Sequence, residues 1–248
     1  DGGNGNDTLD GCDDNCQVEP GALFATELHL TVVDVGADGE QWVELFNPTS
    51  AALDVNRLEL SLARQDGAVL DVSGSCSVQP GKSALIAPQS FYVIALGPIE
   101  TADGLDADIA CPSGFQLEPN GDVLTVRSGV TGLDVLDFQS FGCETLRDGA
   151  GIARSLELVD ATIQTALSND GAGSWCLATV GESYATSGNH VGSPGEAGSC
   201  SEVACDGIDD DCDGQTDELL PDDDDDGACN DIDCDPAVPT CAADCDTD

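Results

Sequence analysis

The sequence predicts an all-β fold, a sandwich or a barrel, on three observations. Short apolar runs of strand length recur through residues 20–200, turn residues (Gly, Pro, Asn, Asp) separate them, and no segment has a sustained helical period. The runs that we expect to form strands are residues 28–35, 42–47, 58–63, 83–87, 91–97, 122–128, 135–141 and 153–160. Many short strands at this spacing are typical of sandwiches and barrels.

The charge of the chain narrows the classes of partner. Its 248 residues include 49 Asp and Glu but only 6 Lys and Arg, which gives a formal net charge of −43. Such a charge excludes nucleic acid and anionic membrane surfaces as partners. With 40% hydrophobic residues the chain can still build a core. No apolar run is long enough for a transmembrane helix, so we expect no membrane insertion.

Cysteine usage indicates where the protein works. Thirteen cysteines in a chain with a single lysine predict an oxidising, extracellular or cell-surface location, with the cysteines paired. The chain contains no methionine and no signal-peptide core, so we expect it to be a piece of a longer secreted protein. An odd count then leaves at least one partner outside it. The disulfide candidates are Cys12, Cys16, Cys76, Cys111, Cys143, Cys176, Cys200, Cys205, Cys212, Cys229, Cys234, Cys241 and Cys245.

Composition divides the chain into three segments. Residues 1–19 contain almost no core-forming residues, residues 20–200 contain the strand pattern, and residues 201–248 hold 19 acidic residues, six cysteines and no basic residue. The expected organisation is therefore a short cysteine-rich fragment, a β domain and an acidic, cysteine-rich segment.

Several motifs of the middle segment resemble those of the lamin-tail domain. Residues 39–48 (GEQWVELFNP) are similar to its W-x-E-L-x-N-P strand and turn, although Asn56-Arg57-Leu58 stands where the family has Ser-Gly-Trp. Other matching stretches are residues 53–62, 79–81, 121–126, 153–157 and 192–195. The resemblance covers roughly residues 25–200. It implies an immunoglobulin-like β-sandwich that serves as a display or interaction module, without catalytic residues to carry over.

The first segment fits two patterns. Residues 2–10 (GGNGNDTLD) fit one turn of a calcium-binding β-roll, but a β-roll needs at least about three stacked repeats. Residues 1–19 also resemble the later part of the cysteine-rich repeat of myxobacterial surface proteins. We prefer the second interpretation, because the missing first cysteines of that repeat would fall before Asp1 and explain the odd count.

The acidic segment contains one stretch with the complete ligand spacing of an EF-hand calcium loop. That loop places oxygen ligands at positions 1, 3, 5, 9 and 12, a carbonyl at position 7 and glycine at position 6. Gly227 occupies the glycine position. The predicted ligands are Asp222, Asp224, Asp226, Ala228 through its carbonyl, Asn230 and Asp233.

A second stretch fills most of the same positions. Asp209, Asp211, Asp213 and Gly214 match the first six places, and Asp217 stands at the ninth. The twelfth place holds leucine, so this loop is incomplete and could borrow Glu218 or Asp222. A solvated acidic linker with incidental spacing is the alternative. Glycine at the sixth place of both loops, together with the interleaved cysteines, favours calcium.

The acidic segment also resembles two known motifs. Residues 205–218 are very similar to a metal-binding motif of bacterial surface proteins, and residues 222–234 resemble thrombospondin type 3 repeats. Hard oxygen ligands favour Ca²⁺ over copper, which prefers imidazole, thiolate or thioether ligands. Both histidines, His29 and His190, lie outside the segment. The expected cofactor is therefore calcium.

Signals for catalysis are few. His190 stands near Ser187 and Ser193, and Asp170 lies upstream, but no flanking signature supports a Ser/His/Asp triad. We therefore expect no enzymatic activity.

Together these patterns predict a secreted or cell-surface, calcium-binding structural protein of a bacterium. Its partners would be calcium and, by way of uncovered sheet edges, copies of itself in an extracellular filament or sheath, or other surface proteins. The alternative is an accessory or adhesive module of a larger secreted hydrolase or adhesin.

Overall fold

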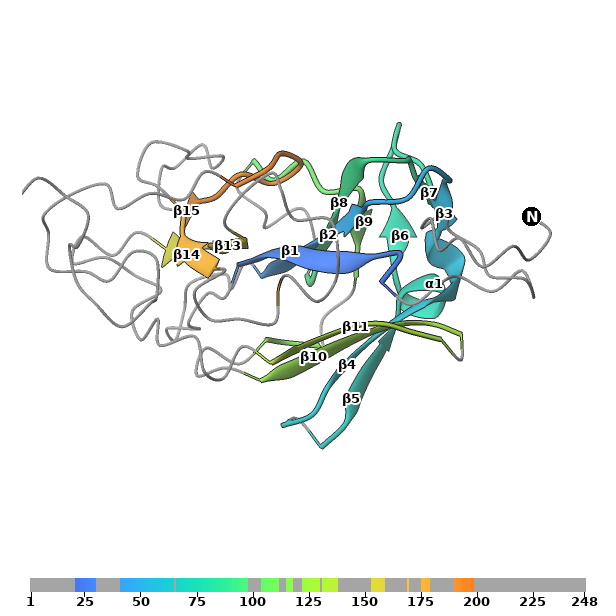
Figure 1. Ribbon diagram of the computed structural model, residues 1–248, viewed down its shortest axis with the longest axis horizontal. Coiled ribbons are helices and arrows are strands. Elements are labelled where there is room, and N and C mark those ends of the chain that lie inside the picture. Colours follow the sequence, from blue (N-terminus) through green and yellow to red (C-terminus); the bar gives the residue numbers. More distant parts are fainter. Residues whose placement is uncertain are drawn as a thin grey trace, which may run out of the picture.

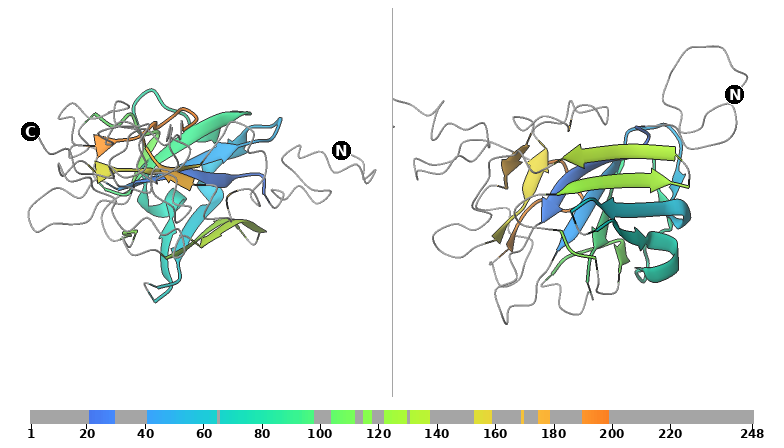
Figure 2. Two further views of the ribbon diagram at one scale, coloured as in Figure 1. Left: turned by 60° about the vertical axis from the view of Figure 1, so that its left-hand side comes forward. Right: turned by 90° about the horizontal axis from the view of Figure 1, so that it is seen from below.

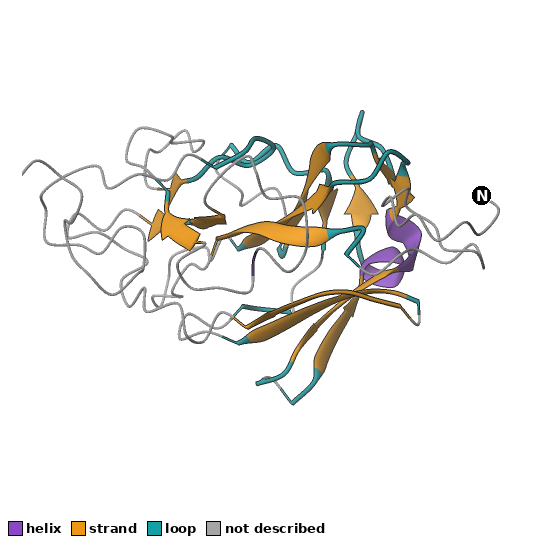
Figure 3. Ribbon diagram, in the orientation of Figure 1, coloured by secondary structure: helices purple, strands orange, loops and turns teal. Residues whose placement is uncertain are grey.

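The computed structural model describes residues 21–29, 41–64, 66–97, 104–111, 115–117, 122–129, 131–137, 153–158, 169, 175–178 and 190–198. In this part of the chain the regular structure is almost entirely β-strand (Figure 3), which confirms the all-β prediction. Its two helical segments are η1 (Val55–Arg57) and α1 (Val72–Ser75). Within the same residues, no helix is long and apolar enough to span a membrane.

The larger sheet has seven strands in the order β14-β13-β1-β2-β8-β9-β6. Its central strands are antiparallel, and the pairing of β8 with β9 is parallel. The strands are β1 (Phe24–His29), β2 (Trp42–Asn47), β6 (Ser77–Val78), β8 (Ser90–Ala95), β9 (Ile109–Ala110), β13 (Leu156–Leu158) and β14 (Trp175–Leu177).

The second sheet has four antiparallel strands in the order β11-β10-β4-β5. These are β4 (Leu58–Leu62), β5 (Ala68–Asp71), β10 (Val123–Ser128) and β11 (Thr131–Asp137). Two small sheets complete the described structure: β3 (Leu53–Asp54) pairs with β7 (Leu85–Ile86), and β12 (Ala153–Arg154) pairs in parallel with β15 (His190–Val191).

One hydrophobic core lies between the two large sheets. Alternate residues of β4, namely Leu58, Leu60 and Leu62, are buried in it, whereas Glu59 and Ser61 between them are partly exposed. The core includes residues of both sheets, such as Val43 and Leu45 of β2. Figure 1 shows β4, β5, β10 and β11 as a layer below β1, and in the view from below this layer covers the blue strands (Figure 2, right).

The predicted strands differ in accuracy. The strand over residues 42–47 is confirmed with both bounds, and those at 58–63, 91–97 and 122–128 are confirmed within one or two residues. The run at 83–87 shrinks to Leu85–Ile86, and the run at 153–160 is divided at Ser155 between two sheets. β1 and β11 begin four residues earlier than the runs at 28–35 and 135–141; residues 30–35 and 138–141 lie outside the described part.

The Asn-Pro end of the WVELFNP motif has an architectural role. Asn47 is fully buried, and its Nδ2 donates to the carbonyls of Ala51 (2.8 Å), Ile86 (3.2 Å) and Ala87 (3.0 Å). Its Oδ1 accepts from both the amide and the hydroxyl of Thr49. One side chain thus ends β2, forms the following turn and holds β7 against it.

A polar contact joins the two large sheets at β1 and β11. The Asp134 Oδ2 accepts hydrogen bonds from the Ala25 amide and from Asn169 Nδ2, both at 2.9 Å, and the same Asn169 nitrogen donates to the Ala25 carbonyl. The register of β1 against β2 shifts between Ala25 and Glu27. Beside this bulge, the Ala25 amide and carbonyl are thus satisfied by the side chains of Asp134 and Asn169.

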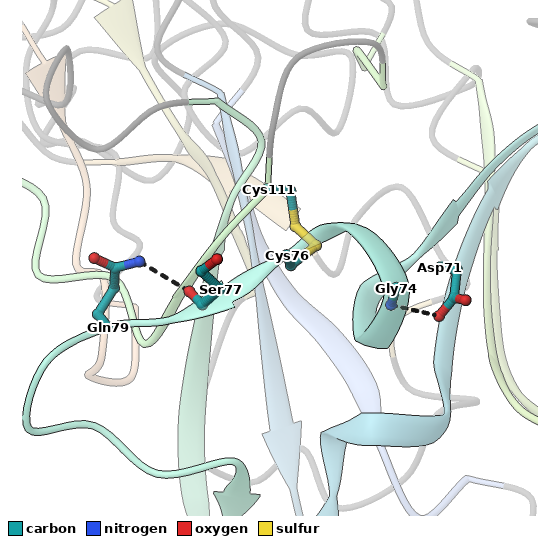
Figure 4. The surroundings of a disulfide bond; sticks show 6 residues. All are labelled: Asp71, Gly74, Cys76, Ser77, Gln79 and Cys111. Carbon is teal, nitrogen blue, oxygen red and sulfur yellow. Dashed lines mark hydrogen bonds between the residues drawn. A yellow bond between two sulfur atoms is a disulfide. The ribbon is translucent and has the colours of Figure 1, made fainter.

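A disulfide joins Cys76 and Cys111, with Cα atoms 4.0 Å apart, so these two candidates do form a disulfide, with a pairing that the sequence left open. Cys76 follows α1, where the chain passes from β5 of the four-stranded sheet to β6 of the seven-stranded sheet (Figure 4). Cys111 follows β9 and is buried, and its amide donates to the Ala95 carbonyl of β8. Asp71 accepts a hydrogen bond from the Gly74 amide at the start of this connection.

Replacing both cysteines (Cys76→Ala with Cys111→Ala) will lower the free energy of unfolding by about 3 to 4 kcal/mol, because the bond closes a loop with a sequence separation of 35. Urea denaturation followed by circular dichroism measures this change. Ser77→Ala, at an exposed neighbouring position, is the control and will leave the free energy within about 0.5 kcal/mol of wild type. An unchanged midpoint in the double variant would contradict the stabilising role of the bond.

Candidate functional site

The predicted calcium ligands lie outside the described residues. This holds for Asp209, Asp211, Asp213, Asp217, Glu218, Asp222, Asp224, Asp226, Ala228, Asn230 and Asp233, so both loops stay predictions. Ten of the thirteen disulfide candidates also lie outside the described residues. The other three are Cys76 and Cys111, which are joined to each other, and Cys176, which is also disulfide-bonded. Among the described residues, no group of three or more His, Cys, Asp and Glu side chains could hold a metal ion.

The described part of the chain has an unexpected polar cluster on the seven-stranded sheet. Val43 and Leu45 of β2 point into the main core, whereas Trp42 belongs to a second, smaller apolar cluster with Val93 and Ala95. Because side chains alternate along a strand, Glu44 lies on the same face as Trp42. We call this the second face of the sheet.

Strand register brings three glutamates together on the second face. Glu27 of β1 is paired with Glu44 of β2 on one side and with Glu157 of β13 on the other. Their relative exposures are 1%, 1% and 0%. Three buried carboxyl groups in neighbouring strands repel one another if they are charged. The stability of this face therefore depends on hydrogen bonds or protons that neutralise them.

Residues 190–198, which we call the strap, cover the three glutamates. The Ser193 amide donates to Glu27 Oε1 at 3.0 Å, and the Gly195 amide donates to Glu44 Oε2 at 2.6 Å. The Ser193 hydroxyl lies 3.3 Å from Glu27 Oε2 and 3.1 Å from Glu157 Oε1. The strap therefore contacts each of the three carboxyl groups directly.

Two glycines let the strap approach the sheet this closely. A Cβ atom at Gly192 would lie 2.5 Å from Glu27 Oε1 and 2.6 Å from Ser155 Oγ, and one at Gly198 would lie 2.8 Å from Glu157 Oε2. Only a residue without a side chain fits at these places.

Burial raises the pKa values of two of the glutamates. Desolvation, with repulsion from Glu157 and Glu44, raises the pKa of Glu27 well above its ordinary value. Desolvation also raises the pKa of Glu44 to about 8, although hydrogen bonds from Gly195 and Thr26 act in the opposite direction. Such a carboxyl group stabilises the folded state while it is protonated. For Glu44 this contribution is fully present below the unfolded pKa of 4.5, and it is lost as the pH rises through the folded-state pKa of about 8.

The only two histidines of the chain meet at the edge of this cluster. His190 Nδ1 lies 3.4 Å from His29 Nε2, and the His29 ring stacks on Trp42 with a centroid distance of 5.7 Å. His29 is fully buried, in line with its expected place in a strand, and His190 is partly exposed. Residues that are 161 positions apart in the sequence thus share one contact.

The candidate Ser/His/Asp set gains no support from this geometry. The Ser193 hydroxyl lies against Glu27 and Glu157, and the His190 ring lies against His29. Ser187 and Asp170 lie outside the described residues. The described cluster holds carboxyl groups, hydroxyls and backbone amides that bind one another, an arrangement suited to fastening a segment rather than to activating a nucleophile.

Sequence reasoning missed this cluster. Glu44, Ser155, Glu157 and residues 192–195 all belong to motifs that carry the lamin-tail resemblance, but their mutual contact could not be read from the motifs. The available signal was an acidic residue inside an apolar strand, as in residues 42–47 (WVELFN) and 24–29 (FATELH). Such a residue is costly to bury and must find partners.

Comparison of the chain with protein-family models, with curated proteins and with solved structures gave no match. The lamin-tail resemblance therefore stays a prediction that rests on the motifs.

The Gly192→Ala substitution will destabilise the protein by about 1 to 3 kcal/mol, because the new methyl group collides with Glu27 and Ser155 beneath the strap. Thermal unfolding at pH 6 measures the loss. Gly97→Ala is the matched control, since a Cβ atom there meets nothing within 4 Å. Equal melting temperatures for both variants would show that the strap does not press on the sheet.

Proposed function

We propose that this protein is a non-catalytic, extracellular structural module of bacterial origin that displays a calcium-binding acidic segment on a rigid β domain. The observation that carries this proposal is the joining of two sheets by one core, with a disulfide at their connection. The chain leaves this domain through the strap and enters the acidic segment at residue 201. A cross-linked domain in an oxidising compartment suits mechanical display.

An immunoglobulin-like sandwich of the lamin-tail type is the finer fold that we propose. Two largely antiparallel sheets with a shared core support it. Further support comes from the convergence of the motif residues: Glu44, Glu157 and the Gly192–Gly195 turn contact one another although the motifs are far apart in sequence. Asn47, from the same motif as Glu44, forms the turn after β2.

Calcium would act by neutralising the acidic segment. Residues 201–248 carry 19 acidic and no basic residues, so the segment repels itself unless cations bind. Six to eight oxygen ligands converge on each calcium ion, which would convert a repelling chain into a stiff spacer held by metal and disulfides.

Isothermal titration calorimetry of the chelator-treated protein will detect calcium uptake. Asp222→Asn with Asp224→Asn removes two predicted charged ligands of the complete loop and will abolish at least one binding event. Asp54→Asn with Asp66→Asn changes the charge equally at exposed sites of the β domain and will leave uptake unchanged. No heat of binding in the wild-type protein, or equal loss in both double variants, would refute the calcium site.

Self-association is the second part of the proposal, and an open sheet edge supports it. β5 is the last strand of the four-stranded sheet in the described part of the chain, and Val69 on it is 61% exposed. An edge strand with an exposed apolar residue is a template for pairing with another chain. The opposite edge, β11, accepts a hydrogen bond from the Gly21 amide at Leu133.

Val69→Lys will prevent assembly, because a charge on the β5 edge opposes pairing with a second copy. Sedimentation velocity and electron microscopy in the presence of calcium report the size of the particles. Val135→Lys is the matched control: Val135 is 54% exposed on β11 and lies away from the β5 edge. A wild-type protein that stays monomeric in calcium would refute the proposed self-association.

A further inference from the structure

The strap is fastened to the second face mainly by the three glutamates. Its other contacts include the two-residue pairing of β15 with β12, the buried side chain of Val191, the hydrogen bond from the Ser155 amide to the Val191 carbonyl at 3.0 Å, and the contact of His190 with His29. The attachment of residues 192–198 therefore depends on the state of Glu27, Glu44 and Glu157.

The serine hydroxyls at the closed strap face more acceptors than they have protons. The Ser155 hydroxyl lies within hydrogen-bond distance of two acceptors, Glu27 Oε1 and the Val191 carbonyl at 3.2 Å. It has one proton, so it can donate to only one of them. A proton on Glu27 adds a donor at this place, so that Ser155 can accept from Glu27 and donate to Val191 at the same time. The Ser193 hydroxyl faces the same choice between Glu27 and Glu157.

We propose that residues 190–198 form a proton-controlled strap, which stays closed over the second face while the Glu27–Glu44–Glu157 cluster holds protons and opens when the cluster loses them. Opening lets water reach the carboxylates and relieves their mutual repulsion. The proposal is independent of calcium binding, since every group that it uses lies in the β domain.

Linkage fixes the direction of the effect. The closed strap buries the glutamates and so raises the pKa of Glu27 and Glu44, while in the open state both return towards 4.5. The closed state thus binds more protons than the open state, and removing protons favours opening. With a closed-state pKa of about 8 for Glu44, this residue alone shifts the equilibrium towards opening by about tenfold between pH 7 and pH 9.

Other charged and titratable groups lie on the elements around the cluster. Asp108, whose carboxylate lies 3.4 Å from Lys82 Nζ, opposes the charged form of Glu44. Arg154 of β12 is buried and donates from Nε to the Ala178 carbonyl, and Glu196 is an exposed residue of the strap itself.

The two histidines would act at the other end of the pH scale. The His29 and His190 nitrogens at 3.4 Å can share one proton, but a second proton would place two positive charges beside each other. This effect opposes closure in acid, not in alkali. The test is therefore confined to pH values from about 7 to 9.5, above the ordinary histidine pKa of about 6.5.

Trp42 is an internal reporter of strap opening. It is fully buried, and a Cβ atom at Gly192 would lie 3.3 Å from its ring, so the strap lies directly over it. Trp175, the other tryptophan, is buried in the main core. As the pH rises, we expect the emission of Trp42 to shift to longer wavelength, and this shift to be absent in Trp42→Phe.

Hydrogen exchange of peptides covering residues 190–198 gives the quantitative test. After correction for the pH dependence of intrinsic exchange, protection in the wild-type protein will fall by about tenfold or more between pH 7 and pH 9. The double variant Glu27→Gln with Glu44→Gln cannot lose these protons and will change by less than about twofold. Glu196→Gln, on the exposed side of the strap, is the matched control and will behave as wild type.

Three results would overturn the proposal. The first is constant protection of the strap in the wild-type protein over this range. The second is an equal fall in Glu44→Gln and in wild type, which also decides the matter if the double variant does not fold. The third is a simultaneous loss of protection in β10, because this would report global unfolding and not release of the strap.

Discussion

The need to neutralise three carboxyl groups buried side by side governs the second face of the seven-stranded sheet. Glu27, Glu44 and Glu157 are adjacent through strand register. Backbone amides of the strap and the hydroxyls of Ser155 and Ser193 contact these carboxyl groups. This solution requires a segment with free amides and little bulk, and the Gly-Ser-Pro-Gly turn of the strap is such a segment.

The same constraint makes the two large sheets differ. The four-stranded sheet alternates buried and exposed residues, as in Leu58 to Leu62 of β4, because one of its faces meets solvent. β2 has a nearly continuous buried pattern, since the core covers one face and the strap and a small apolar cluster cover the other. A sheet buried on both sides loses the period of two in its sequence.

This difference explains what could be predicted. Strands with apolar runs between clear turn residues, such as Trp42–Asn47 and Val123–Ser128, were identified because their signal is local. β14 and β15 were missed, since two or three residues carry no periodicity. The glutamate cluster could not be predicted from the sequence, because it forms only when β1 pairs with β13. This pairing places Glu27 beside Glu157, although the two residues lie far apart in the sequence. The aspartate loops differ from the glutamate cluster, because the spacing of their ligands can be recognised within a short stretch of sequence. They remain a sequence-based prediction.

Strand order also determines when the second face can be completed. β1 and β2 come first along the chain, yet β13 pairs beside β1 and the strap covers both only after more than a hundred further residues. Contacts of such long range form late in folding. Until residues 190–198 arrive, Glu27 and Glu44 stay hydrated and charged, and the sheet has only one buried face. A chain made from its N-terminus would therefore remain loosely packed until the β segments that complete this face have emerged.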